Sequence, residues 1–561
     1  MALSASLAFA SGLVDGSLLA RLGLVLAVTL AVAGVAAMSR PRVWYRQLTD
    51  RLLYGVPWGT LIVMAIMLAV YAGLQDGIGS AEPIVLPFRA WSYLDPVGML
   101  VAGFAHSNTS HLLGNLLGTL LFGSLAEYLW GHHTTRRTTT RPLAAWTHPV
   151  VRAVVIFPAA AILGSIVGSL VALGPIIGFS MVVFAFAGFA LVQAPILAVV
   201  VSVSQGVVRR LFDAFQTPEQ IAASGTTYST PWFASIAIQG HAVGLLAGVL
   251  VGLGYQRLTR RARPSVGRLW AGVLLFAVER SLWAVYWYRG AESYVLYRAI
   301  GVGLVFLLAA LVTYAVIARD EPLVPGLAVP NPQTMLADMT TISHRQVALL
   351  LVIAASSFLV SPAIAANATT IADADLPGEA VEVRGYELTY GENVTDGQIN
   401  VFDIRGFGET TRVNTSGVIV RNTDRHIWST AVSRGELAVS GSAAVRLGGI
   451  GWQETVTATR EEWRAVGGDT TYRVSLTHNN TTRPLYTSPA ATAEPVVAGQ
   501  RITLNATDGG FRLTVGDETA PIPTQGNVTT LNGIQFSRED DRLVAIHDRT
   551  DTAVRVATKV N

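Results

Sequence analysis

Residues 178–189 read GFSMVVFAFAGF, an apolar stretch with a serine near its start. Ser180, Phe184 and Gly188 are spaced four apart, so a helix would place all three on one face. A serine in an apolar helix usually donates a hydrogen bond to a carbonyl one turn earlier, which has no chemical consequence. The rest of the chain must therefore show whether Ser180 is a packing residue or a reactive one.

The composition is that of a membrane protein. Of 561 residues, 51% are hydrophobic and only 14% are charged, which is too apolar for one soluble globule. Cysteine is absent, so disulfides and cysteine-ligated metals are excluded. Stretches of roughly 20 residues, long enough to cross about 30 Å of hydrocarbon as helices, recur about ten times. They lie near residues 18–38, 57–75, 108–130, 151–173, 178–193, 195–211, 234–256, 269–288, 294–318 and 346–366.

Changes in composition divide the chain into five segments. The sequence predicts a polytopic α-helical membrane part followed by a soluble C-terminal domain. The predicted segments are 1–56 with an extra transmembrane helix and a basic loop, 57–256 as the core, 257–345 with further helices and a linker, 346–366 as a last helix or signal-like segment, and 367–561 as a β-rich domain.

The last two segments rest on different patterns. Residues 367–561 alternate apolar and polar side chains, as in VEVRGYELTY (381–390), which predicts an all-β, sandwich-like domain of short antiparallel strands. The stretch HRQVALLLVIAASSFLVSPAIAANA (344–368) has a basic start, an apolar middle and a small-residue end. It reads as a membrane anchor, which we favour, or as a signal-like segment that is cleaved after Ala365 or Ala366.

Arginine-rich loops predict the orientation. The loops at 39–55, 132–142 and 255–268 all fall on one side if every span crosses, and that side should be the cytoplasm. The C-terminal domain is then extracytoplasmic, in a multi-pass protein of the cell membrane. Seven Asn-x-Ser/Thr sequons agree with a glycosylated external domain. They begin at Asn367, Asn393, Asn414, Asn479, Asn480, Asn505 and Asn527.

Two further helices carry polar groups near the same predicted outer end. In HSNTSHLLGN (106–115), His111 and Asn115 are four residues apart and share a face, with His106 just above them. Two polar groups on one face of a membrane helix are expensive unless they serve a function. In QGHAVGLLAGVLVG (239–252), His241 precedes a glycine stripe that allows another helix to approach closely.

These residue types suit nucleophilic catalysis. If the glycine stripe packs against the face that carries Ser180, that hydroxyl comes within hydrogen-bonding reach of His241. A neutral imidazole is a suitable base for a serine nucleophile. No Asp or Glu accompanies His241 in its helix, so we predict a Ser-His dyad. His111 and Asn115 are suited to stabilise the oxyanion of the intermediate.

Over residues 57–256 the chain resembles the rhomboid family of intramembrane serine proteases. Four family motifs occur in order, with Gly240 in place of the usual alanine in the last. The matching residues are His106, His111 and Asn115 of the H-x-x-x-x-H-x-x-x-N signature, Gly123, Glu127 and Gly131 of the G-x-x-x-E-x-x-x-G pattern, GFS at 178–180 of the nucleophile motif, and His241, Gly244 and Gly248 of the A-H-x-x-G-x-x-x-G pattern.

The resemblance implies a six-helix core, with one extra helix before it and about three after it. It implies that Ser180 attacks a peptide bond in the transmembrane segment of another protein, with His241 as base and with His111 and Asn115 lining the oxyanion hole. The expected supporting residues are His106, Gly178, Phe184, Gly188, Gly244, Gly248 and Glu127.

The expected partners follow from the same resemblance. They are transmembrane protein substrates and the lipid bilayer, and no nucleic acid. No metal and no organic cofactor is implied. The C-terminal domain is expected to bind an extracytoplasmic partner that the sequence does not identify. The segment 209–232 lies between two core helices on the outer side and is expected to form a mobile flap.

The chain departs from the family pattern at three places. Met181 follows the nucleophile, where the family usually has glycine, and Phe184 replaces a tyrosine that stacks on the histidine. The Trp-Arg motif of the first external loop is not clear in PFRAWSYL (87–94). We predict that Trp91 is a membrane-interface anchor.

Two other functions are alternatives to proteolysis. A catalytically inactive rhomboid-like scaffold that binds client proteins would be expected to lack Ser180 or His241, and both are present. A transporter would be expected to show paired hydrophobic repeats or several buried charges. Apart from Glu127, Glu279 and Arg280, charges are scarce within the predicted spans, and no repeat is apparent. The histidines at 132, 133, 148 and 344 lie in predicted cytoplasmic loops and are not expected to bind a metal.

Overall fold

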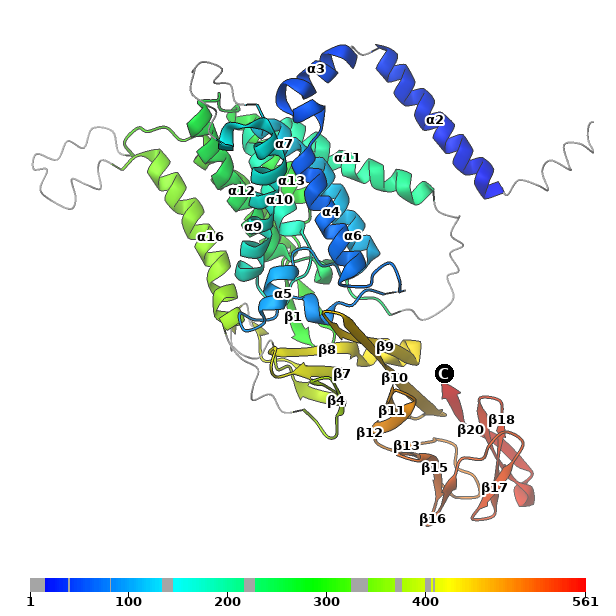
Figure 1. The fold of residues 1–561 in the computed structure, drawn as a ribbon. Coiled ribbons are helices and arrows are strands. Elements are labelled where there is room, and N and C mark those ends of the chain that lie inside the picture. Colours follow the sequence, from blue (N-terminus) through cyan, green and yellow to red (C-terminus); the bar gives the residue numbers. More distant parts are fainter. Residues whose placement is uncertain are drawn as a thin grey trace, which may run out of the picture.

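The protein consists of a helical bundle with a β domain at one end (Figure 1). The computed structural model describes residues 16–38, 41–80, 82–133, 145–215, 228–323, 342–368, 376–398, 405–406 and 409–560. We refer to the two ends of the bundle as the β-domain end and the opposite end.

A helix overlaps each of the ten predicted spans. Their bounds are α2 Gly16–Met38, α3 Pro41–Arg51, α4 Trp58–Gly73, α5 Pro96–Val101, α6 Thr109–Gly118, α7 Ser124–Trp130, α8 Pro149–Val151, α9 Phe157–Val171, α10 Ser180–Gln193, α11 Pro195–Ala214, α12 Ile238–Thr259, α13 Val266–Glu279, α14 Arg298–Ile317 and α16 His344–Ala368. Short π-helical stretches, Thr119–Gly123 and Arg152–Ile156, join α6 to α7 and α8 to α9.

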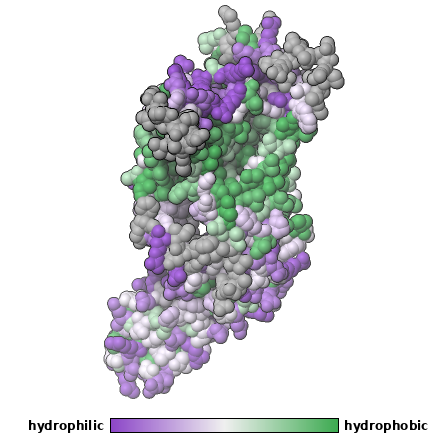
Figure 2. Space-filling view, turned by 90° about the vertical axis from the view of Figure 1, so that its left-hand side faces the viewer, coloured by the Kyte–Doolittle hydropathy of each residue, from purple (hydrophilic) through white to green (hydrophobic). Residues whose placement is uncertain are grey.

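The helical part has the length and apolarity of a membrane domain. Seven helices among the described residues are long and apolar enough to cross a bilayer, and α4 and α10 are shorter apolar helices. Figure 2 shows a band of hydrophobic residues over the bundle, with hydrophilic residues above it and over the β domain below. These features confirm the predicted class of many apolar helices followed by a β domain.

Helix α10 lies at the centre of the bundle. It contacts α6, α7, α9, α11, α12 and α13. Most of its side chains are buried, as expected for a helix that is apolar on all sides. The chain turns at Ala194, and Pro195 begins α11, because proline is well tolerated in the first turn of a helix. Residues 178–189, GFSMVVFAFAGF, therefore supply most of the helix around which the others pack.

One predicted span is too long. We predicted a helix over 269–288, but α13 ends at Glu279 and the chain then forms a β-hairpin from β1 (Tyr286–Gly290) and β2 (Ser293–Leu296). The connecting residues Ala291 and Glu292 both have positive φ, as tight hairpin turns require. The bulky aromatic side chains here continue the apolar run of α13, although they favour strands.

In its described residues the C-terminal domain is β-rich, with one short α-helix, α17 (Arg434–Ser440), and a 3-10 turn at Asp548–Thr550, and its paired strands are antiparallel. Its strands are β3 Val381–Val383, β4 Tyr386–Thr395, β5 Arg405–Gly406, β6 Glu409–Thr410, β7 Asn414–Asn422, β8 Ile427–Ser433, β9 Ser442–Gly449, β10 Trp452–Ala465, β11 Thr470–His478, β12 Thr481–Thr487, β13 Ala491–Thr492, β14 Ile502–Thr507, β15 Gly510–Val515, β16 Glu518–Pro521, β17 Val528–Leu531, β18 Ile534–Glu539, β19 Arg542–His547 and β20 Thr552–Val560.

The strands enclose two main hydrophobic cores. The long strand β10 takes part in both, with Val456 and Ala458 in the first core and Trp463 and Ala465 in the second. The first core lies nearer the bundle, because a residue of the bundle's own loops, Trp91, belongs to it.

Trp91 therefore has a different role from the one predicted. Its side chain is only 5% exposed and its indole Nε1 donates a hydrogen bond to the Leu86 carbonyl, so it is not a membrane-interface anchor. A buried ion pair lies nearby, in which the Arg425 guanidinium is 3.0 Å from the Asp95 carboxylate. The packing of Trp91 in the first core and the ion pair between Arg425 and Asp95 join the β domain to the segment between α4 and α6.

Helix α16 continues past both predicted cleavage points and ends in contact with the bundle. The Asn367 side chain is buried, and its Nδ2 donates to the Ala172 carbonyl at 3.0 Å. Asn367 is therefore inaccessible as a glycosylation site in the folded protein. The sequon asparagines at 393, 414, 479, 480 and 527 are exposed on the β domain.

Candidate active site

Ser180 and His241 meet at the β-domain end of the bundle. Ser180 is the first residue of α10, and His241 lies in the first turn of α12. The Ser180 Oγ is 2.9 Å from the His241 Nε2, which is hydrogen-bonding distance. The structure thus brings together Ser180 and His241, which the sequence analysis predicts to be within hydrogen-bonding reach of each other.

Direct backbone contact between α10 and α12 produces this meeting. A Cβ atom placed on Gly244 or Gly248 would collide with a carbonyl oxygen of α10, and one placed on Gly188 would collide with the Leu245 carbonyl of α12. Both predicted glycine faces are therefore in contact. Side chains larger than hydrogen at these positions would force the helices apart and separate Ser180 from His241.

His111 and Asn115 face the backbone just before the serine. A Cβ atom on Gly178 would lie 2.7 Å from the His111 Nε2 and 3.0 Å from the Asn115 Nδ2. Gly178 also has a φ of +110°, a conformation that other residues rarely adopt. The Asn115 Nδ2 is buried and has no hydrogen-bond partner among the described residues. An amide donor and an imidazole thus converge near Ser180 with unused hydrogen-bonding capacity.

An aromatic ring, and no carboxylate, accompanies His241. The Phe184 ring stacks on the imidazole with centroids 4.1 Å apart and planes 11° apart. The His241 Nδ1 is buried without a hydrogen-bond partner in the part of the chain that is described. The arrangement is a Ser-His pair in which a ring face restrains the histidine.

His106 is part of the wall behind His111. Its side chain is fully buried, and its ring contacts His111 edge-on, with the ring centroids 5.2 Å apart. Burial, followed by the proximity of His111, lowers the pKa of His106 to about 3, so its ring is neutral at physiological pH. The Gln75 side chain holds this loop, because it accepts from the His106 N–H and donates to the His106 carbonyl.

Glu127 of α7 lies at the opposite end of the bundle from the Ser-His pair. Its buried carboxylate accepts hydrogen bonds from the backbone N–H groups of Gly59 and Thr60, at the start of α4. The His132 Nε2 lies 2.7 Å from the same carboxylate, and the His132 Nδ1 accepts from the Leu53 N–H. The sequence analysis places His132 in a cytoplasmic loop and does not predict its contact with Glu127. The sequence signal for this contact is that His132 directly follows Gly131, which ends α7.

Met181 occupies space left by two glycines. Its sulfur would be 2.8 Å from a Cβ on Gly168 of α9, and its methyl 3.0 Å from a Cβ on Gly240 of α12. Met181 and Gly240 are therefore in contact. Met181 fills the junction of α9, α10 and α12. With Met181 in this place, the Ser180 Oγ and the His241 Nε2 are still 2.9 Å apart.

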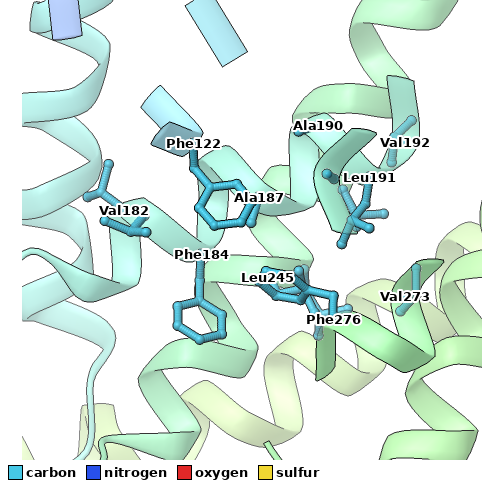
Figure 3. Packing of buried hydrophobic residues seen from close by; sticks show 14 of the residues in the cluster. Phe122, Val182, Phe184, Ala187, Ala190, Leu191, Val192, Leu245, Val273 and Phe276 are labelled. Atoms are coloured by element: carbon cyan, nitrogen blue, oxygen red, sulfur yellow. The ribbon is translucent and has the colours of Figure 1, made fainter. Parts of the chain in front are cut away.

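Two residues near the site were missed by the sequence analysis. Arg89 of the PFRAWSYL stretch donates a hydrogen bond to the Pro175 carbonyl, in the loop before α10. Phe276 of α13 packs against Phe184, and α13 lies outside residues 57–256. Figure 3 shows Phe184 and Phe276 in the apolar interior beside Leu245. Neither contact has a sequence signal, because each joins segments far apart in the chain.

The predicted flap at 209–232 falls largely outside the described residues. Helix α11 occupies its start and ends at Ala214, and a short 3-10 helix, Trp232–Ser235, lies at its end. The residues between 216 and 227 are not described.

Comparison with known proteins gives no assignment. The chain matches no protein-family model, no curated protein and no solved structure.

The helix contact makes a prediction with a built-in control. Gly244→Ala should wedge α10 from α12 and cost about 1–3 kcal/mol of stability, with loss of the Ser180 to His241 contact. Gly240→Ala, one turn away, should be tolerated because the flexible end of Met181 can move aside. Thermal unfolding in detergent and labelling by a fluorophosphonate probe measure both effects. Equal behaviour of the two variants would contradict the interlocked packing.

Proposed function

We propose that this protein is an intramembrane serine endopeptidase of the rhomboid type. The observation that carries the proposal is the 2.9 Å contact between the Ser180 Oγ and the His241 Nε2, beside an unpartnered Asn115 amide. The Ser180 hydroxyl thus contacts a side chain of another helix, whereas the Ser169 Oγ donates to the Ser165 carbonyl of its own helix.

In the proposed reaction, the His241 Nε2 accepts the Ser180 proton as the Oγ attacks the carbonyl carbon of a peptide bond. The resulting tetrahedral intermediate collapses when His241 gives that proton to the leaving amine, and an acyl-serine remains. Water then attacks the acyl carbon and loses a proton to His241, which returns it to Ser180 as the acid product leaves. The cycle consumes one water for each bond cleaved.

The proposed tautomers follow from the contacts. For Nε2 to accept from Ser180, the neutral His241 ring must carry its proton on Nδ1. The stacked Phe184 ring restrains the imidazole plane, a task that an aspartate performs in a triad. For His111 to donate from Nε2, the Ser107 hydroxyl must donate to its Nδ1, and these atoms are 3.1 Å apart. Each donor aimed at the oxyanion would stabilise it by about 3 kcal/mol.

An apolar groove supports a transmembrane substrate. It has a volume of about 320 Å³ and lies between α4, α6 and α11, where Leu113, Leu117 and Phe212 line it. The groove runs along the face of α6 that carries Leu113 and Leu117, and His111 and Asn115 lie on another face of the same helix. Cleavage requires a locally unwound backbone, because an intact helix covers its peptide bonds with its own hydrogen bonds.

We expect Ser180→Ala to abolish cleavage. The variant should cleave a generic transmembrane substrate at least ~10³-fold more slowly than the wild type and should not react with a fluorophosphonate probe. Ser169→Ala removes another buried hydroxyl and should retain both activities. Purified proteins in detergent, with cleavage followed by gel, give the comparison. If Ser180→Ala matches the wild type, the protein is not a serine protease, and the inactive scaffold becomes the better hypothesis.

We further propose that the β-domain end is extracytoplasmic, which follows from the arginine-rich loops at the opposite end. The absence of cysteine allows a clean test with single introduced thiols. Asn527→Cys on the β domain should react with a membrane-impermeant maleimide in intact cells. His133→Cys, exposed at the opposite end, should react only after permeabilisation. The reverse pattern would overturn the proposed orientation.

A further inference from the structure

We propose that Phe276 of α13 positions the His241 imidazole through Phe184, so that the helix after the six-helix core is part of the active site. This inference rests on the proposed Ser-His dyad. Phe276 is a positioning residue in this account, because it contacts neither Ser180 nor the substrate.

The contacts form a short chain of rings. Phe184 stacks on His241, and Phe276 meets Phe184 at 5.6 Å with an interplanar angle of 71°. Phe122, in the π-helical stretch that joins α6 to α7, packs on Phe276 with the ring centroids 5.6 Å apart and an interplanar angle of 87°. Edge-to-face pairs at these distances are favourable and directional. Phe184, Phe276 and Phe122 are 6%, 1% and 1% exposed, so each ring is enclosed by its neighbours (Figure 3).

This support matters because His241 has few other restraints. Its Nδ1 has no hydrogen-bond partner among the described residues, so only the Ser180 contact and the ring face orient the imidazole. A change in the tilt of Phe184 would therefore turn the Nε2 away from the serine hydroxyl. Phe276 fills the space into which Phe184 would otherwise move.

A partly exposed polar cluster at the end of α13 fixes the position of this helix against α11. The Ser202 hydroxyl of α11 donates to the Glu279 carboxylate, and Arg280 donates to the Ser202 Oγ at 2.9 Å and to its carbonyl at 3.1 Å. Arg280 also forms an ion pair with Glu279 at 2.9 Å. Charged groups inside an apolar bundle are tolerated when they satisfy one another, and such a cluster fixes the register of its helices. Glu279 lies three residues after Phe276, on the same part of α13.

A purely structural role for Phe276 would produce a different result. Loss of packing alone would reduce the folded fraction and leave the chemistry of each folded molecule unchanged. Loss of histidine positioning would lower kcat and the rate of probe labelling per folded molecule, and KM for the substrate would stay the same, because the proposed groove lies on α4, α6 and α11.

The test compares Phe276→Ala and Phe276→Leu with Leu275→Ala, a neighbouring position on α13 that is 55% exposed. Full-length proteins in detergent are assayed for kcat, KM, the second-order rate of fluorophosphonate labelling, and thermal unfolding. Phe276→Ala should lower kcat and the labelling rate by ~10–100-fold, as expected for a misplaced catalytic group, with KM within about twofold of wild type. Leu275→Ala should match the wild type.

Phe276→Leu keeps most of the side-chain volume without the ring, so it remains informative if the alanine variant does not fold. It should unfold near the wild-type temperature and still lose activity. Wild-type labelling together with unchanged rates in both Phe276 variants would overturn this inference alone. Wild-type labelling no greater than that of Ser180→Ala would overturn the dyad and this inference with it.

Discussion

The structure depends on the direct contact of two helix backbones, those of α10 and α12. Helices that meet through ordinary side chains lie about 8–10 Å apart. Gly188 on one helix, and Gly244 and Gly248 on the other, leave no room for a side chain between them. This close approach places the first residue of α10 against the first turn of α12. The distance between the Ser180 Oγ and the His241 Nε2 is a consequence of that packing.

The surrounding helices support the contact from different sides. Met181 fills the junction with α9, where Gly168 leaves space for its sulfur, and Phe184 is backed by Phe276 of α13. At the opposite end, Glu127 closes the start of α4 with backbone hydrogen bonds. Buried polar groups thus do different work at the two ends. At one end they are fully paired and hold helices together, and at the other the Asn115 amide and His241 Nδ1 are left without partners in the described residues.

Much of the fold could be predicted because its signals are local. The ten helical spans follow from runs of apolar residues, and the β domain follows from alternation. The pairing of Ser180 with His241 was predictable because residues spaced by three or four share a helix face, and glycines mark close approach. The end of α13 was missed because the bulky aromatic side chains of Tyr286–Gly290 continue the apolar run and occur in membrane helices as well as in strands.

The remaining errors concern contacts between distant segments. Trp91 looks like an interface anchor until a domain more than 280 residues later covers it, and nothing in the local sequence reports that docking. Phe276 lies outside the stretch that resembles rhomboids, so its contact with Phe184 needed coordinates. His132 was missed because its partner Glu127 reads as a helix residue whose side chain could face any neighbour.

The central claim is that His241 activates Ser180. The most direct measurement is the rate at which a fluorophosphonate modifies Ser180 in His241→Ala, with the modified peptide identified by mass spectrometry. The account predicts that the wild type carries the adduct on Ser180 and that His241→Ala, with its serine intact, loses nearly all of it while remaining folded. An adduct on Ser180 that forms equally fast without the imidazole, or an adduct on another serine, would contradict the account.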